Sequence, residues 1–158
     1  MQNFGFSLLE LLIVICISAI CAAIGMQQWK EIQLRNELVS TTHQLAYFLN
    51  EVQVKANTEN ENYSLHLFLS PWCLTITSGE PPTSCQTGLL QFIKPNNSVE
   101  IKLLNEQKII TFWGRRNMAQ TGSFELSNAI GATRVLISFR GRIRFCRINS
   151  YLPSLPAC

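Results

Sequence analysis

The segment Phe4-Gly5-Phe6-Ser7-Leu8-Leu9-Glu10, followed by an apolar run from Leu11 to Met26, decides the fold of this chain. From Phe6 to Met26 there are 21 residues, and a helix of that length spans roughly 31 Å, the thickness of a bilayer's hydrocarbon core. This stretch predicts a membrane-spanning helix. Glu10 is its one charged residue, and an ionised carboxylate at that depth costs on the order of a few kcal/mol unless a cation neutralises it. We therefore expect Glu10 to have a positively charged partner.

Two other interpretations of this segment are an ordinary secretory signal and a plain membrane anchor. A secretory signal has a basic start, an uncharged apolar core and a cleavage site made of small residues. Here residues 1–5 contain no Lys or Arg, Glu10 interrupts the core, and no such cleavage site follows. A plain anchor stays open, because any anchor can carry one unusual residue.

The chain has 158 residues, so about 130 remain beyond the apolar segment, enough for one further domain. Gln27 to Lys55 contains neither Pro nor Gly, and its leucines recur at helical spacing with Glu and Gln between them. We expect the helix to continue through residue 56 as an amphipathic half. The polar stretch Asn57 to Asn62 is expected to be a loop.

From Tyr63 onward the apolar period changes to two, which is typical of half-buried strands. The expected strands lie at residues 63–69, 73–77, 89–93, 99–103, 108–112, 123–127 and 133–146. Ser78 to Thr87, which contains Gly and Pro, is expected to be a loop. The predicted fold class is α+β, with a long N-terminal helix, first transmembrane and then amphipathic, packed on an antiparallel β-domain.

The six cysteines divide into two groups. Two of them lie in the apolar run, where a thiol behaves as a small hydrophobe. The other four form two pairs with the same separation of 12 residues, Cys73 with Cys85 and Cys146 with Cys158. Equal spacings suggest these two bridges, although the sequence alone permits three pairings. Disulfides form in oxidising compartments, so we expect this domain in the periplasm or outside the cell.

The residue inventory argues against an enzyme or a metal protein. The sequence contains no aspartate and no Cys-x-x-Cys pair, and His43 and His66 are far from the cysteines in sequence. It also lacks a serine elbow, a phosphate-binding glycine loop and a pair of catalytic carboxylates. We expect no catalytic residue, no cofactor and no bound metal.

The net charge of +3 conceals an asymmetry. Residues 1–100 hold four Lys and Arg against eight Glu, a balance of −4, whereas residues 101–158 hold nine against two, a balance of +7. A basic half of this kind predicts an anionic partner.

The last expected strand, residues 133–146, concentrates this charge. From Val135 to Phe145 the odd-numbered positions other than Gly141 are apolar and face the core, so the even-numbered positions form an exposed face. Side chains on one face are about 6.6 to 6.8 Å apart, comparable to the separation of successive phosphates along a nucleic-acid strand. The exposed face carries Arg140, Arg142 and Arg144, and the cluster is extended by Arg115, Arg116 and Arg147.

Three roles for these arginines are open: contact with DNA phosphates, ion pairs with glutamates of a neighbouring protein, and a solvated strand edge that blocks aggregation. Trp113 precedes two of the arginines. It could stack on a base, but we expect it to be a core residue beside Phe112.

Two motifs carry a resemblance to a known family. Gly5, the aromatic Phe6 and Glu10 resemble the N-terminal signal of type IV pilins and type II secretion pseudopilins. The segment Gly141-Arg142-Ile143-Arg144 resembles the Gly-Arg-x-Arg pattern of GspH/FimT-type minor pilins. The layout of a Trp-Cys pair early in the β-domain and a terminal Cys is similar to the prepilin-peptidase-dependent protein A branch of that group.

This resemblance implies a pilin-like fold and a processing scheme. Residues 1–5 would be a leader that prepilin peptidase removes by cutting between Gly5 and Phe6, and Phe6 would then be N-methylated. Glu10 would pair with the terminal amine of a neighbouring subunit. The transmembrane half of the helix would be residues 6–26, the amphipathic half residues 27–56, and the disulfide-bridged β-domain residues 57–158.

The resemblance also implies a function. The chain would be a minor type IV pilin in the bacterial inner membrane with a periplasmic β-domain, incorporated with other major and minor pilins at or near the tip of an extracellular pilus, where it primes assembly. Some members of the group bind DNA through these two arginines during natural transformation. This implies double-stranded DNA as a partner here, with contacts at Arg142 and Arg144 and with Arg140 beside them. The alternative is a GspH-like minor pseudopilin of type II secretion, with a structural role in a periplasmic pseudopilus and no DNA binding.

Overall fold

The computed structural model describes residues 7–104, 109–148, 152 and 154–158. The chain divides into two compact units, Met1–Gln33 and Leu34–Cys158. Its helix and strands, in chain order, are α1 (Leu8–Glu59), β1 (Tyr63–Leu69), β2 (Trp72–Thr77), a 3-10 turn (Cys85–Thr87), β3 (Leu90–Ile93), β4 (Glu100–Leu103), β5 (Ile109–Trp113), β6 (Met118–Ala119), β7 (Gly122–Ser127), β8 (Ala132–Ile137) and β9 (Ile143–Arg147).

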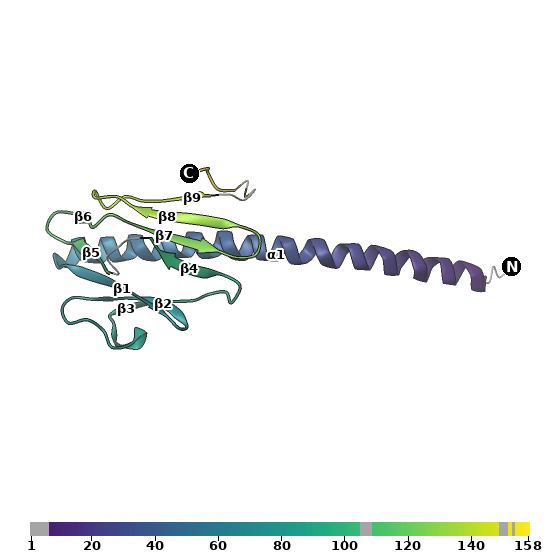
Figure 1. The fold of residues 1–158 in the computed structure, drawn as a ribbon, viewed down its shortest axis with the longest axis horizontal. Helices are drawn as coiled ribbons and strands as arrows, with labels where there is room; N and C mark the ends of the chain where they lie inside the picture. Colours follow the sequence, from purple (N-terminus) through teal and green to yellow (C-terminus); the bar gives the residue numbers. More distant parts are fainter. Residues whose placement is uncertain (1–6, 105–108, 149–151, 153) are drawn as a thin grey trace, which may run out of the picture. The chain divides into compact units, whose positions relative to one another are not determined.

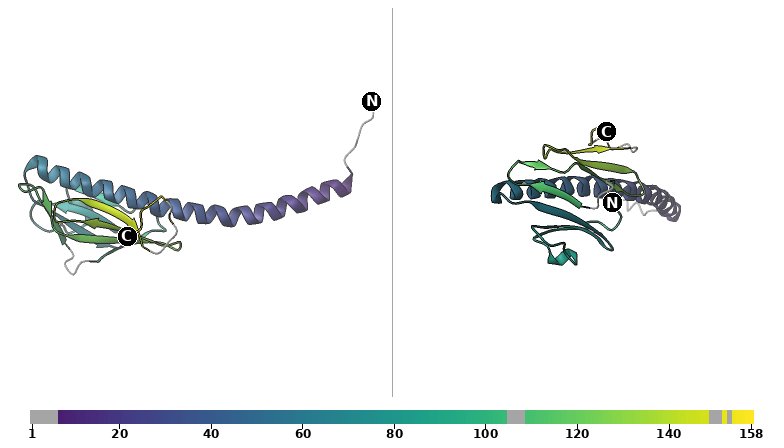
Figure 2. Two further views of the ribbon diagram at one scale, coloured as in Figure 1. Left: turned by 90° about the horizontal axis from the view of Figure 1, so that it is seen from above. Right: turned by 60° about the vertical axis from the view of Figure 1, so that its left-hand side comes forward.

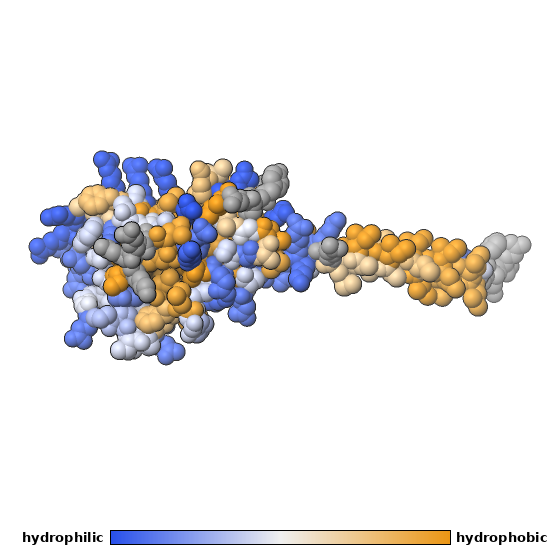
Figure 3. Space-filling model, in the orientation of Figure 1, coloured by the Kyte–Doolittle hydropathy of each residue, from blue (hydrophilic) through white to orange (hydrophobic). Residues whose placement is uncertain are grey.

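The first unit contains the apolar part of α1. An 18-residue window of this helix has a mean hydropathy of 2.6, and none of it is buried within the protein. Figure 3 shows its surface as almost continuously hydrophobic. Ser18, the polar residue within the run, donates its hydroxyl to the carbonyl of Ile15 at 2.9 Å, so its side chain is satisfied without water. By length and composition, this part of α1 is a candidate membrane span.

The second unit contains two antiparallel sheets and the rest of α1. One sheet has the strand order β3-β2-β1-β5-β6 and the other β4-β7-β8-β9. The two sheets lie next to each other over the same part of the helix (Figure 1). The left view of Figure 2 shows that both are on the same side of it. This is the α+β arrangement expected from the change of apolar period at Tyr63.

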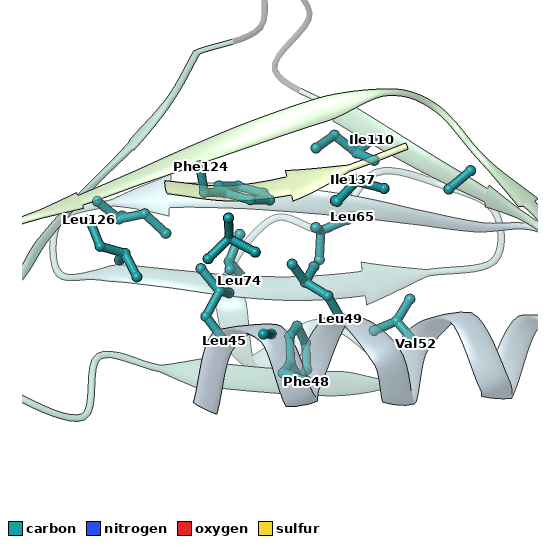
Figure 4. Packing of buried hydrophobic residues seen from close by; sticks show 14 of the residues in the cluster. Leu45, Phe48, Leu49, Val52, Leu65, Leu74, Ile110, Phe124, Leu126 and Ile137 are labelled. Atoms are coloured by element: carbon teal, nitrogen blue, oxygen red, sulfur yellow. The ribbon is translucent and has the colours of Figure 1, made fainter. Parts of the chain in front are cut away.

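The core forms where α1 crosses the two sheets. The helix contributes an apolar stripe with three- and four-residue spacing, as a helix covering a sheet requires. Its members Leu38, Leu45, Leu49, Val52 and Ala56 have no exposed surface. Figure 4 shows how labelled side chains of this stripe point from the helix toward side chains of the strands.

Buried hydrogen bonds fix the helix against the second sheet. Thr42 donates its hydroxyl to the Leu38 carbonyl at 2.7 Å, and its oxygen lies 2.7 Å from the Thr133 hydroxyl on β8. Because the Thr42 proton is already used, Thr133 is the donor in this second bond. About two turns before Thr42, Asn128 donates its amide to the carbonyl of Leu34 at 2.7 Å in a partly buried bond. These bonds set the register of the helix, because apolar packing alone tolerates small shifts.

The two sheets are also linked directly. At one place the Trp72 indole donates to the carbonyl of Val99 at 2.8 Å. At another, the Ala119 amide donates to the carbonyl of Phe139 at 3.1 Å, which joins β6 to the connection between β8 and β9. The second link brings two loops together that are distant in sequence.

The structure joins Cys73 to Cys85 and Cys146 to Cys158. The first bridge holds the loop after β2 against that strand. The second ties the chain end to β9, where Arg147 forms a parallel bridge with Ala157.

Two expected boundaries are wrong. Helix α1 ends at Glu59 rather than before Asn57. In its last turn the Thr58 hydroxyl also donates to the Val54 carbonyl at 3.0 Å, a side-chain bond that a helical conformation allows. The expected strand over residues 133–146 is in fact a hairpin: β8 ends at Ile137 and β9 begins at Ile143.

We expect Leu49→Ala to lower the free energy of unfolding by about 2 to 5 kcal/mol, because it removes buried methyl groups and leaves a cavity between the helix and the sheets. Val54→Ala on the same helix, where the side chain is 60% exposed, should change it by less than about 0.5 kcal/mol. Urea unfolding of the detergent-solubilised chain, followed by near-UV circular dichroism, measures both. Equal effects would show that the stripe is not the core.

Candidate functional site

The connection between β8 and β9 is a tight turn that carries two of the arginines. The Gly141 amide donates to the Ser138 carbonyl at 2.9 Å, and the Ser138 amide donates to the Arg142 carbonyl at 3.0 Å. Gly141 has φ of +68°, so a turn is followed by a left-handed residue, a common geometry for short hairpin loops. Arg140 therefore lies in the turn rather than on a strand face, and Arg142 lies just before β9.

Gly141 is required here by space as well as by backbone angle. A Cβ atom at this position would lie 2.7 Å from Oε1 of Gln53 on α1. Gln53 is buried, and its amide donates to Oδ1 of Asn117 at 2.9 Å. Asn117 belongs to the connection between β5 and β6. One helix side chain therefore contacts both arginine-bearing turns.

The β5–β6 turn packs against the end of α1 through a second glycine. A Cβ atom on Gly114 would lie 2.4 Å from the carbonyl oxygen of Ala56 and 2.6 Å from the backbone of Glu61. The Gly114 amide also donates to Oδ1 of Asn62 at 3.3 Å. Because any larger residue would push this turn away from the helix, Gly114 fixes the position of Arg115 that follows it.

The two turns meet and form one basic surface. The link from Ala119 to Phe139 joins them, and the rings of Trp113 and Phe139 lie 6.2 Å apart in an edge-to-face arrangement. We call the five exposed arginines on these turns and on the first part of β9 the arginine surface: Arg115, Arg116, Arg140, Arg142 and Arg144.

Among the residues that the structure describes, the guanidinium groups of the arginine surface have no partner. Within the described part of the chain, none of them forms an ion pair or a side-chain hydrogen bond. Arg134, one strand away from Arg144, is different because it pairs with Glu125 at 3.3 Å. Arg147, which the sequence grouped with the cluster, also has partners within the structure. Unpaired cations gathered at one place create a field that attracts anions.

One expectation about this region is confirmed and another is wrong. Arg144 faces outward on β9 opposite Leu136, as the alternation predicted, and Arg142 is also exposed. Trp113, expected in the core, is only half-buried and stands beside the exposed Phe139. Trp72 fills the core position instead. Sequence reasoning missed Gln53, because a glutamine in a helix gives no signal of its own.

One carboxylate near this end of the helix, that of Glu59, is paired. Glu59 accepts hydrogen bonds from Lys55 and from the Tyr63 hydroxyl. The bond from Lys55, followed by that from Tyr63, lowers the pKa of Glu59. The hydrogen bond that Tyr63 donates to Glu59, followed by burial of the phenol, raises the pKa of Tyr63 to about 12. Among the described residues, no group of three His, Cys or Glu side chains could hold a metal ion.

The edge of β9 is partly occupied. The Arg147 amide donates to the Pro156 carbonyl at 2.8 Å, and the Cys158 amide donates to the Arg147 carbonyl at 3.1 Å. The last residues of the sequence thus cover the β9 edge at Arg147, where they block pairing with a strand of another molecule.

The N-terminal candidates are separate from this surface in sequence. Gly5 and Phe6 lie outside the described residues. Glu10 lies in the first turn of α1, where its amide donates to the Ser7 carbonyl at 3.0 Å. Its carboxylate has no ion-pair partner among the residues described for this single chain. A partner for this charge would have to come from elsewhere.

We expect Gly141→Ala to lower the free energy of unfolding by about 1 to 2 kcal/mol, because alanine resists the left-handed conformation. The clash of the new Cβ atom with Gln53 should add to this loss. Gly79→Ala is the matched control, because nothing lies within 4 Å of the Cβ position there. Urea unfolding measures both. In a Gln53→Ala background the cost of Gly141→Ala should shrink; an unchanged cost would show that the contact with Gln53 does not matter.

Comparison with known proteins places the fold. No protein-family model matches the chain, and no curated protein is detectably similar in sequence. Solved structures do match. The type IV minor pilin FimU of Pseudomonas aeruginosa strain PAO1, in its P21 crystal form, superimposes with a TM-score of 0.60 and 18% sequence identity, over 73% of this chain and 96% of that one.

A second crystal form of FimU, in space group P65, matches with a TM-score of 0.56 and 17% identity, over 72% of this chain and 98% of that one. The minor pseudopilin EpsH of the type 2 secretion system of Vibrio cholerae matches with a TM-score of 0.54 and 9% identity, over 70% and 97% of the two chains. This chain has the fold shared by minor pilins and minor pseudopilins.

Proposed function

We propose that this chain is a minor type IV pilin whose arginine surface binds DNA. In this proposal prepilin peptidase cuts between Gly5 and Phe6, Phe6 is N-methylated, and the protein passes from the inner membrane into a pilus, at or near its tip. The apolar part of α1 packs among other pilin subunits, and the β-domain carries the arginine surface into the medium.

One observation carries the assembly role: a membrane-length apolar helix continues into the helix that forms the core of a minor-pilin fold. The β-domain needs only the part of α1 from Leu34 onward for its core. The apolar part must be covered by something else, and lipid followed by the helices of neighbouring subunits would do so.

Glu10 gives this packing a register. An ionised carboxylate among apolar helices is costly unless it is paired. The amine that peptidase cleavage would create at Phe6 of a neighbouring subunit is a suitable cation. The charge-assisted hydrogen bond between them forms at one axial offset only.

The arginine surface supports DNA as the ligand. Its five guanidinium groups have no partner within the described ranges of the chain. Arginine is well suited to phosphate because its planar fork donates two parallel hydrogen bonds. The turns that hold them are fixed by Gln53 and the end of α1. A preformed site loses less entropy on binding than a flexible one.

The second candidate is a minor pseudopilin of type II secretion, favoured by the match with EpsH. In that role the arginines would pair with carboxylates of an adjacent subunit, and the protein would not bind DNA.

Processing tests the assembly role. In a strain that makes type IV pili, we expect mass spectrometry of sheared filaments to find this chain beginning at Phe6 with one added methyl group. Glu10→Ala should still be cleaved but should remain in the membrane fraction, because the register contact is lost. An uncleaved chain, or equal amounts of Glu10→Ala and unaltered protein in filaments, would contradict the proposal.

DNA binding tests the arginine surface. With the full chain in non-ionic detergent, we expect Arg142→Ala/Arg144→Ala to weaken duplex DNA binding and to reduce the slope of log K against log salt by about 2, since each arginine releases roughly one counterion. The matched control is Lys94→Ala/Lys102→Ala. It removes the same charge near β4, at the opposite edge of the sheet from β9.

The control should change duplex affinity less than the arginine variant does. Equal losses would mean that only net charge matters. Absence of binding by the unaltered chain at low salt would leave the pseudopilin role.

A further inference from the structure

Beside the arginine surface the β-domain has a hollow of ≈ 370 Å³. This volume is within the range of small-ligand sites. The two turns that hold the arginines form its walls, and its lining residues are Asn62, Trp113, Arg115, Arg116, Met118 and Phe139. Aromatic, apolar and cationic groups therefore meet in one concave place.

The aromatic side chains in this hollow are more exposed than packing requires. Phe139 is 54% exposed at the tip of a hairpin, where a polar residue would be expected. Trp113 is half-buried, and its ring meets that of Phe139 at an angle of 62°. Two rings set edge to face leave part of each aromatic face open. A flat π-system can stack there.

The two arginines of the hollow lie beside the aromatic rings, where the phosphates attached to a stacked base would be. Arg115 and Arg116 come directly after the Trp113-Gly114 pair and line the same hollow. Both are exposed and have no partner among the described residues. Nucleotides combine a planar ring with a phosphate, and single-strand binders use this pairing of aromatic stacking with a positive groove.

We infer that the hollow between Trp113 and Phe139 is a subsite for an unpaired nucleobase, with Arg115 and Arg116 on the adjoining phosphates. This inference rests on the proposed DNA binding and goes beyond it. A base within a duplex is stacked between its neighbours and cannot enter the hollow, whereas an unpaired base exposes its face. The protein therefore prefers single strands, or unpaired ends of duplexes, to blunt duplexes.

The test compares two probes on the full chain in non-ionic detergent: oligothymidylate, and a blunt duplex with the same number of phosphates. Phe139→Leu keeps the apolar bulk but removes the aromatic face, and Phe139→Tyr keeps the face. We expect Phe139→Leu to weaken single-strand binding roughly 5- to 150-fold, the effect of losing one stacked base. Duplex binding should stay unchanged, and Phe139→Tyr should bind both probes normally.

A fluorescence measurement gives an independent readout. Trp29→Phe leaves Trp113 and the buried Trp72 as the tryptophans. We expect oligothymidylate, but not the blunt duplex, to quench this emission. The matched control is Ile93→Ala, an exposed apolar position on β3 outside the hollow and away from the arginine surface, which should leave binding and quenching unaltered.

The outcomes separate the two claims. If duplex and single strand bind but Phe139→Leu affects neither, or both equally, the nucleobase subsite is overturned while DNA binding stands. If single-strand binding occurs without quenching, the subsite is likewise overturned. If the unaltered chain binds neither probe at low salt, the proposed DNA function has failed, and the subsite fails with it.

Discussion

Burial of one helix stripe is the constraint on which the β-domain depends. The stripe from Leu38 to Ala56 covers the inner faces of both sheets. The sheets themselves form separate hydrogen-bonded ladders joined by a few bonds. Without the helix, each sheet would expose an apolar face that its own strands cannot cover. The helix is therefore the structural centre of the domain rather than an attachment to it.

The same helix organises the arginine surface. Gln53 stands next to Val52 of the apolar stripe, yet its amide contacts Asn117, and its side chain occupies the space that a larger residue at 141 would need. The end of the helix receives the other turn at Gly114. Two segments far apart in sequence are thus brought to one place by one end of one helix. The proposed ligand follows from guanidinium groups that have no partner in the described part of the chain and that are held on turns fixed by the helix.

Much of this fold could be predicted from apolar periodicity, because helix and strand bury every third to fourth and every second residue. The hairpin could not be seen this way. Ile137 and Ile143 both face inward, so the alternation continues unbroken across the turn. A glycine inside a strand pattern often marks a bend, so Gly141 was the one local sign of the turn. The exposure of Trp113 and the role of Gln53 depend on contacts between distant segments, which no local pattern records.

Amide hydrogen exchange of the full chain in detergent, with and without Gln53→Ala, tests most directly whether the helix holds the arginine surface. The account predicts that residues 114–119 and 138–142 lose protection together in the variant, while the segment between Cys73 and Cys85, which Gln53 does not contact, is unchanged. Loss of protection in one turn alone, or in neither, would contradict it, because the Gln53 side chain would then not hold the two turns together.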